Sequence, residues 1–129
     1  MGISMSNFAA SKISATCEGL LQARQFTRHH LARWGLEDVV DEVVAVVGEL
    51  TGNAVRHAAS GEGAWLALAT GPRTVMCIVR DSSCQVPAPR VALQLATEGR
   101  GLSVVASLSS TWGWTVEDNG KAVWARIPI

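Results

Sequence analysis

The stretch Val43–Ala59, VVAVVGELTGNAVRHAA, decides the fold, because it has the pattern of a long helix with two different sides. At about 100° per residue, Glu42, Asn53 and Arg56 fall within roughly 40° of Glu49. The residues that spread over the other side are apolar: Leu36, Val40, Val43, Val47, Leu50, Ala54 and Ala58. The helix therefore offers one side to a core and presents a carboxylate, an amide and a guanidinium together on the other.

This polar stripe has two interpretations. Charged residues spaced three or four apart usually form a solvated helix face, and that interpretation stays open here. The alternative is a ligand site, because asparagine is a poor residue for a helix interior. Gly48 and Gly52 also weaken the helix, by roughly 1 kcal/mol each relative to alanine. Glycines beside Glu49 and Asn53 indicate that another group approaches the helix closely.

Length and composition predict one domain, residues 1–129, with a real core, since 48 % of the residues are hydrophobic. The formal net charge of zero argues against bulk electrostatic binding to nucleic acid. No apolar run approaches the ~18 residues of a membrane span, and the N-terminus lacks the apolar region of a signal peptide. Cys17, Cys77 and Cys84 form no CxxC pair, which is typical of reduced thiols in a cytoplasmic protein without a zinc site.

The rest of the chain alternates helical and strand patterns. Residues 1–15 are expected to be a flexible segment or an edge strand. Helices are predicted over about Glu18–Trp34, Glu37–Ala59 and Leu102–Ser109, with a short helical piece at 91–96 inside the loop that begins at Ser82. Hairpins are predicted over Ala64–Thr70 with Thr74–Asp81, and over Trp112–Glu117 with Ala122–Ile127. Segregated helices and hairpins predict an α+β fold: a two-layer sandwich whose mixed, mostly antiparallel sheet has helices on one face.

Two further places could carry chemistry. Gly99-Arg100-Gly101 precedes a predicted helix, where backbone amides and the helix dipole favour an anion such as phosphate, although such glycines often only form a turn. Asp81 ends an apolar strand, where its carboxylate could accept a hydrogen bond from a ligand amine or could cap the strand end. The sequence has no GxxxxGK[ST], GxGxxG or GxSxG motif, which excludes a P-loop, a Rossmann fingerprint and a nucleophile elbow.

The order of these signals resembles the GHKL (histidine-kinase-like) ATPase superfamily. Glu49-Leu50-x-x-Asn53-Ala54-Val55-Arg56-His57 resembles its N-box, and the loop VRDSSCQVPAPR that contains Asp81 resembles the next box. EGRGLSVV (98–105) looks like its glycine-rich lid, and Gly120-Lys121-Ala122-Val123-Trp124 looks like its closing hairpin. The most similar subfamily is that of the anti-sigma-factor serine kinases and their stand-alone bacterial relatives.

The resemblance implies the Bergerat fold with ATP and Mg²⁺ bound between the helices and the lid. It implies Glu49 as general base, Asn53 as the Mg²⁺ ligand and Asp81 as the ligand of the adenine amine. It also implies that nucleotide contacts come from Arg56, Ser83, Gly99, Arg100, Gly101, Leu102 and Ala122. The implied activity is that of an ATP-dependent protein serine/threonine kinase that regulates transcription. Its protein partner would be an anti-anti-sigma factor, with a sigma factor as second client, and a homodimer is left open.

Two departures from the family pattern support an alternative of a different class. Ser83 stands where the second box has glycine, and Ala122 stands where the last box usually has a threonine that assists adenine binding. Both changes predict weak ATP affinity. The alternative function is therefore a non-catalytic interaction module that keeps the fold with weak or lost nucleotide binding, and a helical-face structural protein without ligand is a third interpretation.

Overall fold

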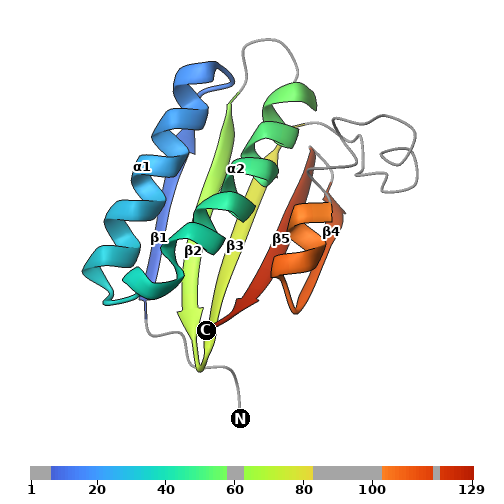
Figure 1. Ribbon diagram of the computed structural model, residues 1–129. Coiled ribbons are helices and arrows are strands. Elements are labelled where there is room, and N and C mark those ends of the chain that lie inside the picture. Colours follow the sequence, from blue (N-terminus) through green and yellow to red (C-terminus); the bar gives the residue numbers. More distant parts are fainter. Residues whose placement is uncertain (1–6, 58–62, 83–102, 118–119) are drawn as a thin grey trace.

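The computed structural model describes residues 7–57, 63–82, 103–117 and 120–129 (Figure 1). Its elements are β1 (Asn7–Ile13), α1 (Cys17–Arg33), the 3₁₀ helix η1 (Glu37–Val39), α2 (Val40–His57), β2 (Ala64–Gly71), β3 (Thr74–Asp81), β4 (Thr111–Glu117) and β5 (Gly120–Pro128). Residues 103–108 are also helical. The predicted elements at these places are confirmed with ends shifted by a few residues, and the predicted helical piece at 91–96 lies outside the described residues.

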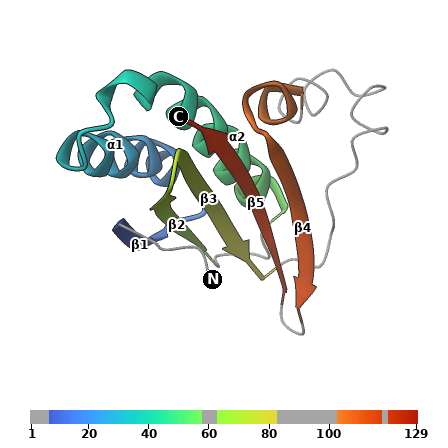
Figure 2. The same ribbon diagram turned by 90° about the horizontal axis from the view of Figure 1, so that it is seen from below.

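The strands form one sheet in the order β1-β2-β3-β5-β4, and every neighbouring pair is antiparallel. Both long helices and the helical residues 103–108 cover the same face of this sheet, as the view from below shows (Figure 2). The α+β sandwich with helices on one face is therefore confirmed. The sheet, expected to be mixed, is wholly antiparallel over the described strands.

Local signals set both ends of α1. The Thr16 hydroxyl accepts a hydrogen bond from the Gly19 backbone N–H (3.2 Å), as a helix N-cap does. After Trp34 the chain turns at Gly35, whose φ of 73° suits a residue without Cβ. A tight end at this point lets the chain reverse at once, and α2 packs against α1.

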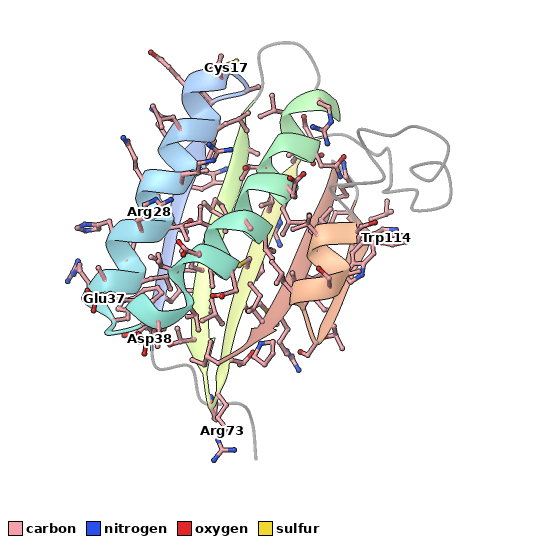
Figure 3. The ribbon with its side chains drawn as sticks, in the orientation of Figure 1. Cys17, Arg28, Glu37, Asp38, Arg73 and Trp114 are labelled. Carbon is pink, nitrogen blue, oxygen red and sulfur yellow. The ribbon has the colours of Figure 1, made fainter. Side chains whose placement is uncertain are left out.

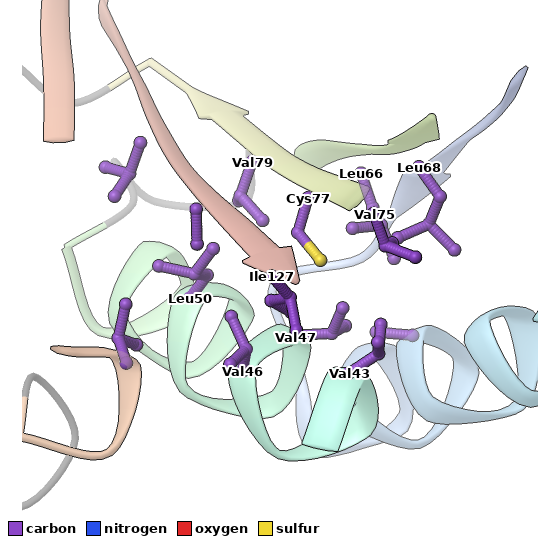
Figure 4. Packing of buried hydrophobic residues seen from close by; sticks show 14 of the residues in the cluster. Val43, Val46, Val47, Leu50, Leu66, Leu68, Val75, Cys77, Val79 and Ile127 are labelled. Carbon is purple, nitrogen blue, oxygen red and sulfur yellow. The ribbon is translucent and has the colours of Figure 1, made fainter. Parts of the chain in front are cut away.

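The core lies between α2 and the middle of the sheet (Figure 4). Val43, Val47 and Leu50 on α2 are buried as the periodicity predicts. Val46, which the predicted apolar side did not include, is buried with them. Their sheet partners alternate along the strands, as a pleated strand requires: Leu66 and Leu68, Val75, Cys77 and Val79, and Val123, Ala125 and Ile127. This packing fixes which residues of β3 and β5 point towards the helices.

The chain reverses between β2 and β3 at Pro72 and Arg73, and Arg73 has a φ of 56°. This hairpin tip lies at the end of the molecule opposite to Cys17 (Figure 3). The end of β3, the start of β5 and the C-terminal half of α2 consequently meet at the other end (Figure 1). That end is where the residues of the candidate site gather.

Two features that the composition predicts can be followed in the structure. Cys17 and Cys77 are free thiols, and Cys84 lies outside the described residues. Burial raises the pKa of the Cys77 thiol to about 12, so this thiol stays protonated. None of the helices over the described parts of the chain has both the length and the hydropathy needed to cross a membrane.

Candidate functional site

Helix α2 carries the first half of the site. Glu49 is half-buried, Asn53 is 8 % exposed and Arg56 is exposed. A solvated helix face therefore describes Arg56 but not Asn53. Over the described residues, neither Glu49 nor Asn53 makes a side-chain hydrogen bond or ion pair with another part of the chain. A buried amide normally has a hydrogen-bond partner, so this carboxylate and amide, one helical turn apart, are groups available to a ligand.

A Cβ on either glycine of the stripe would make only ordinary van der Waals contacts with the described residues. A Cβ on Gly48 would lie 3.8 Å from the Arg24 guanidinium, which reaches across from α1. A Cβ on Gly52 would lie 3.5 Å from the guanidinium of Arg56, which folds back along its own helix. The described neighbours of these glycines are thus two guanidinium groups at ordinary contact distance, and the close approach expected at the glycines stays a prediction.

Glu49 opens onto a cleft of about 340 Å³ between α1, α2 and the helical residues 103–108. Arg24 and Arg28 line the α1 side of this cleft, and Val104 lines its third side. Guanidinium groups bind carboxylates and phosphates through paired N–H donors. Asp41 lines the cleft as well, so two guanidinium groups face two carboxylates, and the guanidinium groups are the cations that an anionic ligand near Glu49 would meet.

Asp81 carries the second half of the site, at the end of β3. It continues the buried series Val75, Cys77 and Val79, so its side chain points towards the helices. Lys121 lies directly opposite it on β5. Lys121 Nζ donates to Asp81 Oδ1 (3.2 Å) and lies 3.0 Å from Oδ2, and both side chains are 0 % exposed. The carboxylate expected to meet a ligand amine is thus in a buried ion pair.

The strand register places Ala122 on the opposite face of the sheet from Asp81. Ala122 pairs with Arg80 on β3 and with Thr115 on β4, one position on from the Asp81–Lys121 pair. Because successive side chains alternate between the faces of a sheet, the Ala122 methyl points away from the helices and from the Asp81 carboxylate. The residue beside the aspartate is Lys121, which the sequence analysis did not include among the site residues.

A signal for Lys121 was present in the sequence. The apolar residues of β5 alternate, and the series Val123, Ala125 and Ile127, extended backwards by two, reaches residue 121. This alternation puts residue 121 on the core face and residue 122 on the other. Matching the motif letter by letter concealed that information, because the motif records order along the chain and not the face of the sheet.

A larger cleft, of about 800 Å³, lies near Asp81 at the ends of β1, β2 and β3. It is lined by Lys12, Ser14, Ala15, Thr16, Gln22, Gly63, Trp65, Arg80, Asp81 and Ser82. The whole Asp81 residue is 6 % exposed while its side chain is 0 % exposed, so Asp81 meets this cleft through its backbone. The Asp81 carboxylate therefore does not face this cleft. The buried Ser82 Oγ has no hydrogen-bond partner among the described residues and is a second polar group available beside Asp81.

The donor set of α2 suits magnesium better than a metal held by protein alone. Over the described residues, no three His, Cys, Asp or Glu side chains cluster as a metal site requires. Magnesium usually takes one or two protein oxygens and completes its shell with water and phosphate oxygens. The Asn53 amide oxygen is of the kind that could serve as one of these protein oxygens. The remaining expected contacts, at Ser83, Gly99, Arg100, Gly101 and Leu102, lie outside the described residues.

The outside of α1 is basic and carries an aromatic row. The ring of His30 packs against Phe26 and Trp34, with centroids 4.5 Å and 5.5 Å apart. Burial lowers the pKa of His30 below its ordinary value, and the charges of His29 and Arg33 lower it further. The expectation of solvated histidines describes the exposed His29 better than the half-buried His30.

Comparisons with known proteins agree with this geometry. Residues 13–127 match the family model of the histidine kinase-like ATPase domain. A comparison with curated protein sequences gives no match. Among solved structures, the crystal structure of the RsbU and RsbW domains of Rv1364c from Mycobacterium tuberculosis matches with a TM-score of 0.72 and 18 % identity, which shows the fold. That match covers 95 % of this chain and 32 % of the other, so this chain spans about a third of that protein's length. Since the family model covers nearly all of the sequence, the chain belongs to the histidine kinase-like ATPase domain family.

Proposed function

We propose that the chain is an ATP-binding regulator that transfers the γ-phosphoryl group of ATP to a serine of a protein partner. Family membership supports nucleotide binding, and the similarity in fold to a structure with an RsbW domain supports a regulatory role. The partner we propose is an anti-anti-sigma factor, so the reaction would control transcription. A sigma factor is the proposed second client.

The observation that carries this proposal is the pair Glu49 and Asn53 on α2. Both side chains lack partners within the described residues, and both lie on the half of α2 that is near the end of β3. Phosphoryl transfer depends mainly on positioning and charge stabilisation, so few protein groups are needed. Glu49 would accept the proton of the serine hydroxyl, and Asn53 would hold Mg²⁺ through its amide oxygen. Arg24 and Arg28, which line the Glu49 cleft, would add positive charge near the phosphates.

A specific observation favours a second candidate function. The Asp81 carboxylate is in a buried ion pair with Lys121, where the family resemblance implies an adenine amine. A chain that satisfies its own base-binding carboxylate could act as a non-catalytic interaction module. The two candidates differ in one measurable property, which is Mg²⁺-dependent binding of ATP.

Isothermal titration with ATP, in the presence and absence of Mg²⁺, tests the proposed function. We expect wild-type chain to bind ATP more tightly with Mg²⁺, and Asn53→Ala to lose that Mg²⁺ dependence because the metal ligand is removed. Asn7→Ala is the matched control, since Asn7 lies on the edge strand β1, away from α2, and its amide donates to Thr70 on β2 (3.0 Å). Mg²⁺-dependent binding that persists in Asn53→Ala would refute the metal assignment, and absence of ATP binding in the wild type would favour the interaction module.

The partner is found by capture from a lysate on the immobilised chain, followed by mass spectrometry. The captured protein is then incubated with the chain and γ-labelled ATP. Label on a partner serine supports the kinase function. Capture without label, under conditions in which ATP binds, supports a regulator that binds nucleotide and does not transfer it.

A further inference from the structure

The Asp81–Lys121 ion pair determines what the base-binding carboxylate can bind. The Lys121 ammonium lies within 3.2 Å of both carboxylate oxygens, and neither side chain has any exposed surface. An ammonium group presents three donors and no acceptor, and the exocyclic amine of adenine is likewise a donor towards a carboxylate. The lysine and the adenine amine would therefore use the same acceptor.

The position of Lys121 is built into the backbone. Gly120 has a φ of 153°, and a Cβ there would overlap the carbonyl oxygen of Asp81. Only glycine allows β5 to begin so close to the end of β3. The next residue on β5 is then opposite Asp81 in the antiparallel ladder and on the same face of the sheet. The ion pair thus follows from the strand register and does not depend on a flexible surface side chain.

Burial makes the pair persistent. The Lys121 ammonium is removed from water, and without the Asp81 carboxylate it would be buried with no counter-ion among the described residues. A ligand that takes the carboxylate must therefore also provide for the ammonium. The contrast in the same sheet is the ion pair between Arg80 on β3 and Glu117 on β4, at 3.1 Å, whose side chains are 59 % and 38 % exposed and can separate into water.

We propose that Lys121 is an internal occupant of the base-binding carboxylate, which keeps the base site closed until the ammonium moves away from Asp81. The proposal rests on the proposed function in assigning Asp81 to the base of a purine nucleotide. It makes residue 121 the residue that sets nucleotide affinity in this chain. It also replaces the expectation from the sequence that Ala122 limits that affinity.

The experiment compares Lys121→Thr with Ala122→Thr by titration with ATP and Mg²⁺. Both variants introduce the same side chain at adjacent positions, one on the face of Asp81 and the other on the opposite face. We expect Lys121→Thr to bind ATP at least about tenfold more tightly than wild type, the factor that corresponds to about one charge-assisted hydrogen bond. Ala122→Thr should bind within about twofold of wild type.

A second variant, Lys121→Met, removes the ammonium but keeps most of the apolar stem. Circular dichroism and thermal melting show whether the Lys121 variants are folded without ligand. If either is partly unfolded, ATP with Mg²⁺ should raise its melting temperature by more than it raises that of wild type, because the base then provides a donor in place of the ammonium. Failure of millimolar ATP to stabilise either variant overturns the proposal.

The outcomes separate this proposal from the proposed function. Equal ATP affinity in wild type and Lys121→Thr overturns the inference and leaves the ATP-binding function in place. Weaker binding by Lys121→Thr also overturns it, since Lys121 would then be a ligand of the base. Binding by the folded variant alone supports the inference and shows that the native chain has no working nucleotide site. If neither folded protein binds ATP, both the inference and the proposed function fail.

Discussion

The two halves of the candidate site are built in opposite ways. On α2, Glu49 and Asn53 are four residues apart on one helix and have no partner within the described chain. At the end of the sheet, Asp81 and Lys121 are forty residues apart and are paired to each other without solvent contact. The polar groups of the helix half are therefore available to a ligand, whereas in the sheet half the Lys121 ammonium already contacts the Asp81 carboxylate.

Because of this difference, substituting a carboxylate should have different effects on stability and on activity in the two halves. The half-buried Glu49 carboxylate on α2 keeps part of its hydration, so substituting it should change the catalytic rate more than the stability of the fold. A carboxylate in the core depends on its counter-ion, so changing either partner should alter folding first. The predictions below test this contrast, beginning with the largest expected effect.

The largest effect is expected for Glu49→Gln on phosphoryl transfer. Glutamine keeps the shape of glutamate but cannot accept the proton, and general bases typically contribute about 10²–10⁴-fold. We expect transfer to the partner serine to fall by that factor, with ATP affinity and melting temperature nearly unchanged. Glu42→Gln is the matched control on the exposed start of the same helix. Equal transfer rates in the two variants would remove Glu49 from the role of base.

The next effect is expected for Lys121→Met on stability without nucleotide. Removing one partner of a buried ion pair typically costs about 3–5 kcal/mol, because the other charge stays buried without that counter-ion. Urea unfolding should show this loss for Lys121→Met. Arg80→Met, which breaks the exposed pair with Glu117 (3.1 Å), should lose no more than about 1 kcal/mol. Similar losses of unfolding free energy in the two variants would show that the Asp81–Lys121 pair is not shielded from water.

The smallest effect concerns His30 on the basic outside of α1. Its pKa is lowered in the folded chain, chiefly by burial, from an ordinary value of 6.5. As the pH falls below 6.5, the unfolded chain binds more protons at this residue than the folded chain, so stability should decrease. Melting temperatures measured between pH 5 and 8 should fall less steeply towards acid in His30→Gln than in wild type. Parallel curves for the two proteins would contradict the assignment.

Most of the helix half could be predicted from the sequence. A helix has a fixed period, so spacing alone put Glu49 and Asn53 on one stripe and Val43, Val47 and Leu50 on the buried side. The spacing did not reveal that Asn53 is buried, nor that the guanidinium of Arg24 lies over Gly48. Both facts depend on what packs around the helix, and the residues that pack there are distant in sequence.

Much less of the sheet half could be predicted. The sequence identified Asp81 at the end of a strand and the closing hairpin, but the motif alignment chose Ala122 where the register chooses Lys121. A shift of one residue in a strand moves a side chain to the other face, so an alignment by motif cannot decide the neighbour of Asp81. The contacts expected at Ser83 and at 99–102 lie outside the described residues and stay predictions.

The sequence by itself determined what depends on short-range order: the two amphipathic helices, the two hairpins, the α+β class and the carboxylate and amide one turn apart. Tertiary structure alone decided what depends on strand pairing. Gly120 brings β5 against the end of β3, and the register then places a buried lysine on the aspartate expected to bind the base. The physical reason is that a helix satisfies its backbone hydrogen bonds with near neighbours, whereas a sheet satisfies them with segments far along the chain.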